Sequence, residues 1–202
     1  MSMRVTKNMN STSLLEKLLG TTPVEWRQLG NFVNVKRGKR LVKNQLEPVG
    51  TYPVYQNSMT PLGYYHENNV IGNTTFVICA GAAGEIGYSN TAFWAADDIH
   101  FLETPDYIQN KFLYYYLLTQ QRHILSQVRR ASIPRLSKTA IEKILVPIPC
   151  PDKPEKSLAI QSKIISILDK FTELTTELTT ELTIRQKQYE YYRDLLFSFP
   201  KP

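Results

Sequence analysis

Apolar and polar positions follow two different patterns along this chain, one before and one after a proline-rich segment near residue 150. Between residues 24 and 89, short apolar runs alternate with turn residues, which favours strands and turns. The clearest strand is predicted over residues 74–80, whose sequence TTFVICA is β-branched and apolar. Gly81, Gly84 and Gly87 follow and indicate a tight loop. Further strand pieces are predicted over residues 93–96 and 99–102.

Helical spacing replaces this pattern from residue 107 onward. Apolar residues keep a helical period over residues 107–127, without Gly or Pro, so one helix is predicted there. Ser137 is a good N-cap for a short helix that runs to residue 144. Residues 146–154 then contain four prolines, which predicts an extended connector and a domain boundary.

A long amphipathic helix is predicted after the prolines, because residues 156–199 lack both Gly and Pro. Its apolar residues recur at steps of mostly 4 and 3, the spacing of a coiled-coil seam. At 1.5 Å per residue, about 40 residues give a helix of roughly 60 Å, which cannot bury its own stripe and needs a partner helix. The seam residues expected to mediate dimerisation are Ile160, Ile164, Ile167, Phe171, Leu174, Leu178, Leu182, Tyr189, Tyr192 and Leu196.

Three copies of the tetrapeptide TELT occupy residues 172–183 of this predicted helix. Threonine is a mediocre helix former, so helix propensity does not explain six of them. Consecutive steps of four also depart from a strict heptad, as a stutter does. Either the repeats set the length of the helix in units of about 6 Å, or they are chance low complexity in an ordinary coiled coil.

Charge is unevenly distributed, although the whole chain carries only +6. Residues 1–150 hold 16 basic and 10 acidic side chains, whereas residues 151–202 hold 8 of each. One basic cluster lies between residues 36 and 43 and a second between residues 122 and 143. Two such clusters are typical of a polyanion-binding surface made of separate segments, and the alternative is an ordinary solvated surface.

The sequence offers no catalytic centre. The spacing G-x-x-G-x-x-G at residues 81–87 differs from the dinucleotide fingerprint, and no helix is predicted after it. The three histidines are scattered and give no metal-ligand spacing. Two cysteines cannot form a disulfide framework, and no apolar run is long enough for a membrane span. Residues 14–19 predict a short amphipathic helix and no secretory signal, so a soluble cytoplasmic protein is expected.

The ordered set of motifs resembles the DNA-specificity (S) subunit of type I restriction-modification systems. The segments that carry the resemblance are VEWRQLG at residues 24–30, Gly38-Lys39, AGAAGEIGY at residues 80–88, LYYYLL at residues 113–118 and SIPRLS at residues 132–137. VPIP at residues 146–149, followed by IQSKIISILD at residues 160–169, resembles the start of the family's conserved spacer helix. The linker departs from the family's usual Pro-Pro followed by an acid–Gln pair. Full-length members also have two recognition domains and two spacer helices, so this chain resembles half a subunit.

The resemblance implies an α+β fold, with one mixed α/β target-recognition domain followed by a long C-terminal coiled-coil helix. The expected divisions are an N-terminal tail and short helix (1–23), the recognition domain (24–150), a proline-rich linker (151–157) and the spacer helix (158–199). The family is non-catalytic. It directs methyltransferase subunits, which carry S-adenosylmethionine, and restriction subunits to a bipartite site on double-stranded DNA. No cofactor is expected on this chain itself, and a homodimer is expected because only one long helix is present.

The candidate DNA-binding residues come from the two basic clusters and from the turn-rich sequence between them. The basic candidates are expected to contact phosphates, with one Arg reading guanine, and the polar and aromatic candidates to reach base edges. For the two tyrosines, ordinary core packing is an equal alternative. The candidates are Lys36, Arg37, Lys39, Arg40, Lys43, Asn57, Ser58, Tyr64, Tyr65, Arg129, Arg130, Arg135 and Lys138.

Two other functional hypotheses remain open at this point. A stand-alone dimeric DNA-binding regulator or decoy would lack methyltransferase partners, so binding to a methyltransferase subunit separates it from the S subunit. A cryptic nuclease would cut DNA in the presence of Mg²⁺. The target bases cannot be deduced, because readout depends on loop geometry.

Overall fold

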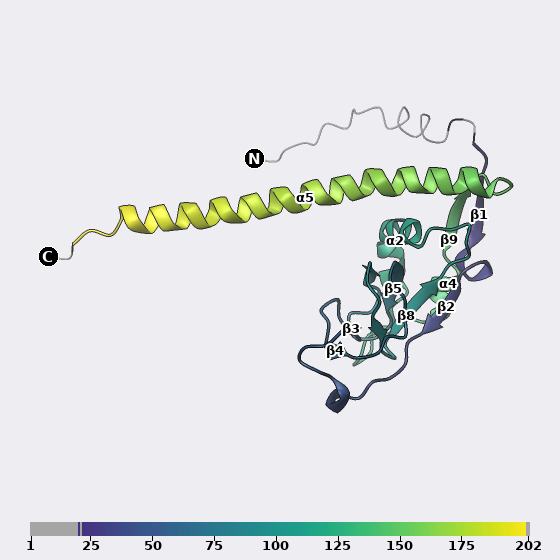
Figure 1. Cartoon of the computed structure of the whole chain (residues 1–202), viewed down its shortest axis with the longest axis horizontal. Helices are drawn as coiled ribbons and strands as arrows, with labels where there is room; N and C mark the ends of the chain where they lie inside the picture. Colours follow the sequence, from purple (N-terminus) through teal and green to yellow (C-terminus); the bar gives the residue numbers. More distant parts are fainter. Residues whose placement is uncertain (1–19, 21, 201–202) are drawn as a thin grey trace. The chain divides into compact units, whose positions relative to one another are not determined.

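The computed structural model describes residues 20 and 22–200 and divides the chain into two compact units, which meet between Lys163 and Ile164. The first unit is a mixed strand and helix domain. The second consists of the remainder of one long helix, α5 (Pro154–Leu196), and the C-terminal tail. The predicted fold class is therefore confirmed (Figure 1). The helix predicted at residues 14–19 lies outside the described residues.

A four-stranded antiparallel sheet forms the centre of the domain. Its order is β2 (Asn34–Arg37), β8 (Ile99–Glu103), β5 (Thr74–Ile78) and β6 (Ile86–Ser89). All five residues of β5 are buried, as its apolar and β-branched sequence predicts. One face of the sheet packs on an aromatic cluster that contains Phe76, Phe93 and Phe101.

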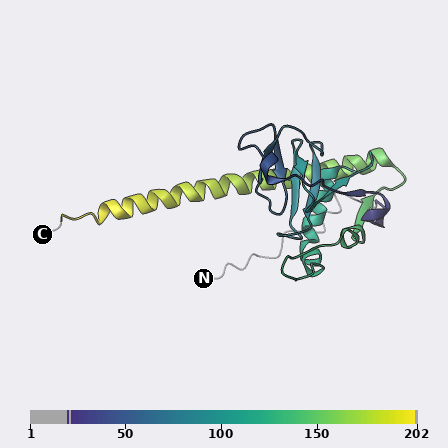
Figure 2. The ribbon, with the colours of Figure 1, turned by 90° about the horizontal axis from the view of Figure 1, so that it is seen from below.

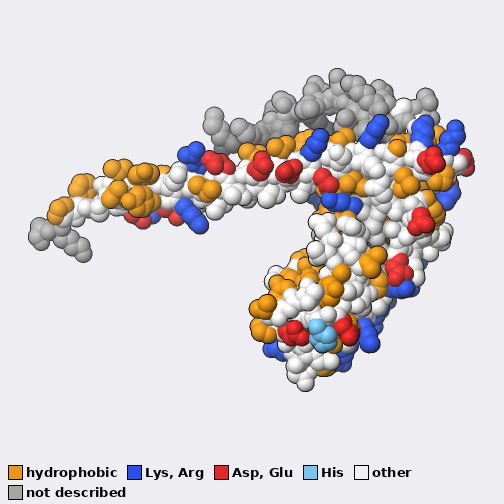
Figure 3. All heavy atoms as spheres, in the orientation of Figure 1, with side chains coloured by type: hydrophobic (Ala, Val, Ile, Leu, Met, Phe, Trp, Pro, Cys, Tyr) orange, Lys and Arg blue, Asp and Glu red, His pale blue; other side chains and the backbone are white. Residues whose placement is uncertain are grey.

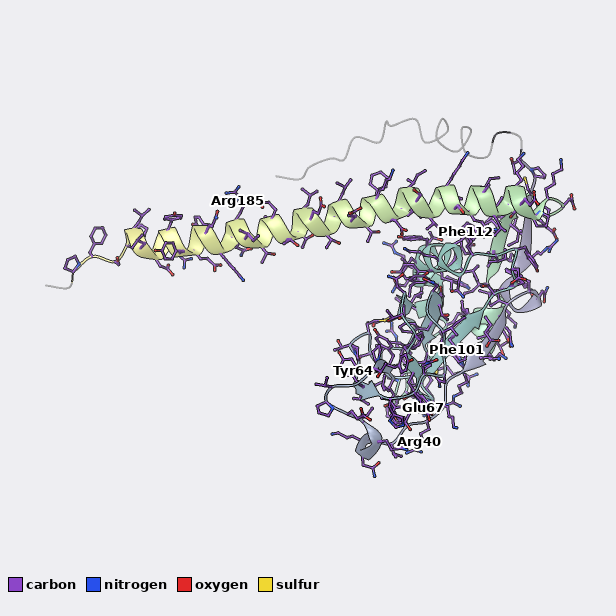
Figure 4. All side chains as sticks on the ribbon, in the orientation of Figure 1. Arg40, Tyr64, Glu67, Phe101, Phe112 and Arg185 are labelled. Atoms are coloured by element: carbon purple, nitrogen blue, oxygen red, sulfur yellow. The ribbon has the colours of Figure 1, made fainter. Side chains whose placement is uncertain are left out.

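Helix α2 (Asn110–Thr119) covers the other face of the sheet. Asn110 fixes it there: the Asn110 Oδ1 atom accepts a 2.6 Å hydrogen bond from the Thr75 amide, and Nδ2 donates a 2.7 Å bond to the Leu102 carbonyl. The first residue of the helix therefore joins two central strands. Figure 4 shows Phe112 of α2 and Phe101 of β8 within this domain.

Two smaller sheets flank the central one. One has the order β4 (Gly63–Tyr65), β3 (Tyr52–Tyr55) and β7 (Trp94–Ala95), with β3 and β7 parallel. The other pairs β1 (Val24–Gln28) with β9 (Leu145–Pro149) in antiparallel register. The two views place β1 and β9 at one end of the domain and β3 and β4 at the other (Figure 1 and Figure 2).

The helix predicted over residues 107–127 is interrupted. It consists of α2 and α3 (Gln121–Ser126), with Gln120 between them outside the helical conformation. The short helix α4 (Lys138–Glu142) begins as predicted, because the Ala140 amide donates a 3.2 Å hydrogen bond to the Ser137 hydroxyl. In the described part of the chain, two 3-10 turns are present, η1 (Leu29–Asn31) and η2 (Lys43–Gln45).

The proline-rich segment differs from the extended connector that its composition predicts. Residues 145–149 form β9, with Val146 and Ile148 buried. Proline is tolerated in this strand because a two-stranded sheet has only edge strands, which need fewer donors. Helix α5 starts at Pro154, four residues before the expected position, and proline suits the first position of a helix.

The first two turns of α5 belong to the domain. Ser157, Ile160 and Gln161 are buried, and Gln161 is 0% exposed. Its Oε1 atom accepts a 2.8 Å hydrogen bond from the Gln109 amide, and its Nε2 atom donates to the Tyr107 carbonyl at 3.1 Å. Ile160, which was expected in the dimerisation seam, is thus buried within its own chain because this turn packs on the domain.

Candidate nucleic-acid interface

The first basic cluster begins where β2 ends, and its backbone is fixed to the segment between β7 and β8. The Arg37 Nε atom donates a 2.6 Å hydrogen bond to the Asp97 carbonyl. The Gly38 amide donates to the Ile99 carbonyl and the Lys39 amide to the Ala95 carbonyl, both at 2.9 Å. The Trp94 indole donates a 2.9 Å bond back to the Lys39 carbonyl. These bonds hold Arg37 and Lys39 at one end of the central sheet.

Gly38 is required at this position by a close approach of two backbones. A Cβ atom added there would lie 2.1 Å from the Ala96 carbonyl oxygen and 2.4 Å from that of Ala95. No side chain fits at these distances. The glycine therefore lets the loop lie against β7 between two basic residues.

The second basic cluster reaches the same end of the sheet from the other half of the sequence. Arg129 and Arg135 exchange two backbone hydrogen bonds, of 2.9 and 3.1 Å. Arg135 also lies opposite Ala80 in an isolated bridge, and the Leu136 amide donates a 2.9 Å bond to the Cys79 carbonyl. The loop that carries both arginines is thus attached directly after β5.

Asn57 joins these segments through the glycine loop. Gly81 adopts a φ of +79°, and a Cβ atom there would lie 2.8 Å from the Asn57 Cβ atom. The Ala82 amide donates a 3.0 Å hydrogen bond to the Asn57 carbonyl. The predicted base-contacting asparagine therefore lies beside the loop that follows β5.

Charged side chains of both clusters affect the pKa values of two buried groups, the Cys79 thiol and the His100 imidazole. Burial and the negative charge of Asp98 raise the pKa of the Cys79 thiol to about 11, against the opposing effect of Arg37 and Arg135. Burial lowers the pKa of His100, and the charges of Arg37 and Lys138 lower it further. The hydrogen bonds give the geometry: Arg37 bonds to Asp97, the Cys79 amide donates a 2.7 Å bond to the Asp98 carbonyl, and Leu136 bonds to Cys79. The two clusters, about a hundred residues apart in sequence, are therefore close in space.

We refer to the surface formed by Arg37, Lys39, Asn57, Arg129 and Arg135 as the basic edge. All five side chains are exposed. Figure 3 shows Lys and Arg side chains along the border of the domain near β2. Cationic side chains can contact the phosphates of DNA, and an asparagine amide can reach a base edge.

Arg40 and Arg130 are exposed neighbours of the basic edge in sequence, and Lys43 lies exposed in η2. Arg40 and Tyr64 are both seen at the end of the domain formed by β3 and β4 (Figure 4). Tyr64 is 37% exposed and can reach a ligand. These four side chains are therefore not counted as part of the basic edge.

Other predicted DNA-binding residues have partners within the domain. Lys36 Nζ lies 2.8 Å from the Glu103 carboxylate, and Lys138 Nζ lies 3.3 Å from the Glu142 carboxylate. The Ser58 hydroxyl donates to the Thr60 carbonyl at 2.9 Å. Tyr65 packs edge-on against Trp94, with 5.0 Å between ring centroids. For Tyr65, core packing therefore fits the structure better than contact with a DNA base.

His100 was missed as a residue of interest, because the sequence shows the histidines only as scattered. It lies on the central strand β8, directly opposite Arg37 of β2, and is 6% exposed. The sequence of residues 99–102 indicates a strand, but it does not reveal which strand pairs with it. The pairing that brings Arg37 beside His100 could therefore not be predicted from the sequence.

The helix α5 carries the second candidate surface. Phe171, Leu174, Leu178 and Leu182 are between 52% and 70% exposed, and Ile164 and Ile167 are partly buried. Tyr189, Tyr192 and Leu196 are exposed farther along, and Figure 3 shows hydrophobic side chains gathered toward the C-terminal end of the helix. Apolar side chains spaced along one helix and left in solvent indicate a protein-binding face.

The threonines of the three repeats are satisfied within the helix itself. All six hydroxyls donate to the carbonyl four residues earlier, at 2.7 to 2.9 Å. They consequently require no partner to accept their hydrogen bonds. These threonines therefore leave no hydroxyl group without a hydrogen-bond acceptor in α5.

Among the residues that the structure describes, no three His, Cys, Asp or Glu side chains gather as a metal site. Over the same residues, no helix has the length and apolar character needed to cross a membrane.

Comparisons with known proteins agree with this arrangement. The family model described as "Type I restriction modification DNA specificity domain" matches residues 22–187. The type I restriction enzyme EcoR124I/EcoR124II specificity subunit of Escherichia coli is 38% identical over 200 residues, which is 95% of this chain and 48% of that protein. A putative type I restriction enzyme specificity subunit of Haemophilus influenzae is 36% identical over 94% of this chain and 50% of its own length. The chain thus spans about half the length of these relatives.

Solved structures share the fold. The S subunit of a type I restriction-modification system from M. genitalium superposes with a TM-score of 0.68 at 24% identity, over 89% of this chain and 47% of that one. The HsdS subunit from Thermoanaerobacter tengcongensis superposes with a TM-score of 0.59 at 15% identity, over 84% of this chain and 45% of that one.

Proposed function

The chain belongs to the type I restriction-modification DNA specificity family, and on that premise we propose that it is a sequence-specific DNA-binding subunit that directs methyltransferase and restriction subunits to a bipartite site. The observation that carries the proposal is the basic edge, where both basic clusters meet at one end of the central sheet. Its cations, Arg37 among them, supply affinity for the DNA backbone, and Asn57 is the side chain that we expect to reach a base edge.

The chain itself has a recognition role and no catalytic one. The partner subunit that carries S-adenosylmethionine methylates adenine, and this chain determines which DNA site is methylated. The burial of Cys79 and the raised pKa of its thiol support this division, because a protonated, buried thiol is a poor nucleophile.

The active assembly is a homodimer built through α5. A single recognition domain reads one half of a bipartite site, and a second copy supplies the other half. The exposed apolar side chains of α5 support this pairing, because a matching helix buries them. Identical readers related by a two-fold axis select a split palindrome.

Co-expression with the methyltransferase subunit of a type I system tests the proposal. We expect methylated adenines at one split palindrome when both proteins are present, and none when this chain is omitted. The Arg37→Ala variant should lose most of that methylation, whereas Lys153→Ala, an exposed change of equal charge, should retain it. Methylation that is independent of this chain would overturn the proposal.

Incubation of the purified protein with DNA and Mg²⁺ provides a second readout. A specificity subunit leaves the DNA intact. Cleavage by the chain alone would assign it to the nucleases instead.

A further inference from the structure

Two glutamines join the start of α5 to the start of α2 by an exchange of hydrogen bonds. The Gln161 side chain of α5 accepts from the Gln109 amide and donates to the Tyr107 carbonyl, both immediately before α2. The Gln109 side chain in turn donates from its Nε2 atom to the Leu158 carbonyl of α5 at 3.0 Å and to the Ser162 hydroxyl. Each glutamine therefore holds the other helix, and we refer to this pair as the glutamine junction.

The glutamine junction fixes the two segments more narrowly than apolar packing would. Two apolar surfaces can slide with little change in buried area, whereas a hydrogen bond is lost when its atoms move about 0.5 Å beyond their usual separation. Gln161 is 0% exposed, so water cannot restore a bond that its side chain loses. Its Nε2 atom also donates to the Ser157 hydroxyl at 3.0 Å, which holds the amide in place. A change of tilt at this point would leave buried polar groups unpaired.

The central sheet connects the glutamine junction to the basic edge. Asn110, the residue after Gln109, bonds to both β5 and β8. The other ends of the same two strands hold the two parts of the basic edge, because Gly38 bonds to the start of β8 and Leu136 bonds directly after β5. The whole of β5 is buried, and it spans about 13 Å between its bonds with Asn110 and with the second basic cluster. A short, buried path therefore leads from α5 to the basic edge.

We propose that Gln109 and Gln161 are positioning residues, which hold the basic edge in one orientation to the first turns of α5. In the homodimer, each copy then reads its half-site at one fixed distance from the other half-site. This inference deepens the proposed function and rests on it for the consequence on DNA. Its geometry rests on contacts within the first compact unit alone.

The length of α5 makes its direction at the glutamine junction important. About 50 Å of helix lie between Gln161 and Leu196. A tilt of about 10° at Gln161 would move the far end of a straight helix of that length by about 9 Å, more than two base-pair steps of about 3.4 Å. A loose junction would therefore permit several gaps between the half-sites, and a tight one permits a single gap.

Distances between two spin labels test the positioning on the full chain. The labels are attached at Glu67→Cys in the domain and at Glu177→Cys in α5, two exposed positions. Cys79 and Cys150 are buried and should not react. An excess of unlabelled chain restricts the measurement to distances within one copy. We expect a single narrow distance distribution in pulsed EPR.

Gln109→Met and Gln161→Met keep the side-chain length and remove the exchanged hydrogen bonds of the side chain. Each should broaden the distance distribution by roughly twofold. Gln120→Met is the matched control, because Gln120 lies at the other end of α2, is also partly buried and bonds only to the neighbouring Thr119 side chain. Circular dichroism reports whether each variant folds. Gln109 is only partly buried, so Gln109→Met tests the proposal even if Gln161→Met does not fold.

The gap between the half-sites gives a functional measurement. DNA substrates carry the split palindrome with the gap shortened or lengthened in single base pairs, and the methyltransferase subunit is present. The unaltered chain should direct methylation to one gap. In the two junction variants the preference for that gap over its neighbours should fall by roughly tenfold, and the bases read in each half should stay the same.

The outcomes separate this proposal from the proposed function. Broadening in the junction variants, with Gln120→Met unchanged, would support the positioning role. A distribution that stays narrow in the junction variants would overturn it, as would a broad distribution in the unaltered chain or equal broadening by Gln120→Met. Narrow distances that broaden as expected, in a chain that directs no methylation at any gap, would overturn the proposed function and leave the positioning role standing.

Discussion

Arg37 of β2 lies directly opposite His100 of β8, and its guanidinium adds to the effect of burial in lowering the pKa of the imidazole. His100 is 6% exposed, and its Nδ1 atom has no hydrogen-bond partner. A neutral imidazole therefore lies beneath the basic edge. The cation that we propose binds DNA disfavours a second positive charge on the neighbouring imidazole.

This relationship predicts how stability depends on pH. Since the pKa of His100 is lowered in the folded chain, the unfolded chain takes up this proton at a higher pH. The contribution of His100 to stability is complete above a pH of about 6.5 and is lost as the pH falls toward the lowered pKa. The urea concentration at the unfolding midpoint should decrease less between neutral and mildly acidic pH in the His100→Gln variant than in the unaltered chain. His123→Gln, at an exposed position, should leave the pH dependence of the midpoint unchanged. An equal reduction of the pH dependence by both variants would contradict the role given to His100.

Binding to DNA should depend on salt through the first basic cluster. Replacing Arg37 and Arg40 by Ala should weaken binding and reduce the slope of log affinity against log salt by roughly one per lost phosphate contact. Lys153 and Lys156, replaced together, give the same charge change elsewhere on the domain. An unchanged slope would mean that the two arginines do not touch the backbone, and a loss at one base position alone would make one of them a base reader.

Gly38→Ala should distort the loop that carries Arg37 and Lys39. The added carbon would overlap the Ala95 and Ala96 carbonyl oxygens, so a loss of about 1–3 kcal/mol is expected in chemical denaturation. Gly63→Ala is the milder comparison, because its new Cβ would lie 3.3 Å from the Leu46 Cβ atom, a contact that a shift of that side chain by a few tenths of an ångström relieves. Equal stability of the two variants would show that the loop can move away from β7.

Gln161→Ala should destabilise the domain although residue 161 belongs to the long helix. The change removes the acceptor of the Gln109 amide and the donor to the Tyr107 carbonyl, and leaving such buried groups unpaired costs about 1–3 kcal/mol each. Thermal unfolding followed by tryptophan fluorescence reports on the domain, which holds both tryptophans. Gln188→Ala, on an exposed turn of α5, should have no measurable effect.

Deletion of residues 176–179 should shorten the gap between the two half-sites by about one or two base pairs, because four residues span about 6 Å. The bases read in each half should not change, since the basic edge lies before residue 150. The seam rotates by only about 40°, so the coiled coil survives, whereas deletion of two residues would turn it toward the opposite face. Mapping of methylated sites in cells with each deletion measures the gap. An unchanged gap would make the repeats filler.

Local sequence signals predicted the elements that depend on them. The strand at β5 followed from a β-branched apolar run, and the start of α4 followed from the Ser137 cap. The long helix followed from the absence of Gly and Pro after Pro154. Each of these signals lies within a few residues of the feature that it predicts.

Features that depend on distant partners were not predictable from such signals. Residues 145–149 look like a connector until β1 is placed beside them, about 120 residues earlier in the chain. Ile160 fits the helical stripe, and only the domain's packing shows that it is already buried. Likewise, Lys36 and Arg37 are equivalent in sequence, but the strand pairing gives Lys36 to Glu103 and leaves Arg37 at the basic edge.

The pairing of β1 with β9 also sets the order in which the chain can fold during synthesis. The partner of β1 is made more than a hundred residues after β1 itself, a wait of roughly 6–24 s at about 5–20 residues per second. Throughout that time β1 is an unpaired strand, and such a strand can pair with the wrong chain. Its Val24 and Trp26 side chains stay exposed even in the folded domain. Glu25 and Arg27, which form an ion pair with each other on this strand, place two charges between its apolar side chains. Charges at these positions protect a nascent strand against aggregation until its late partner arrives.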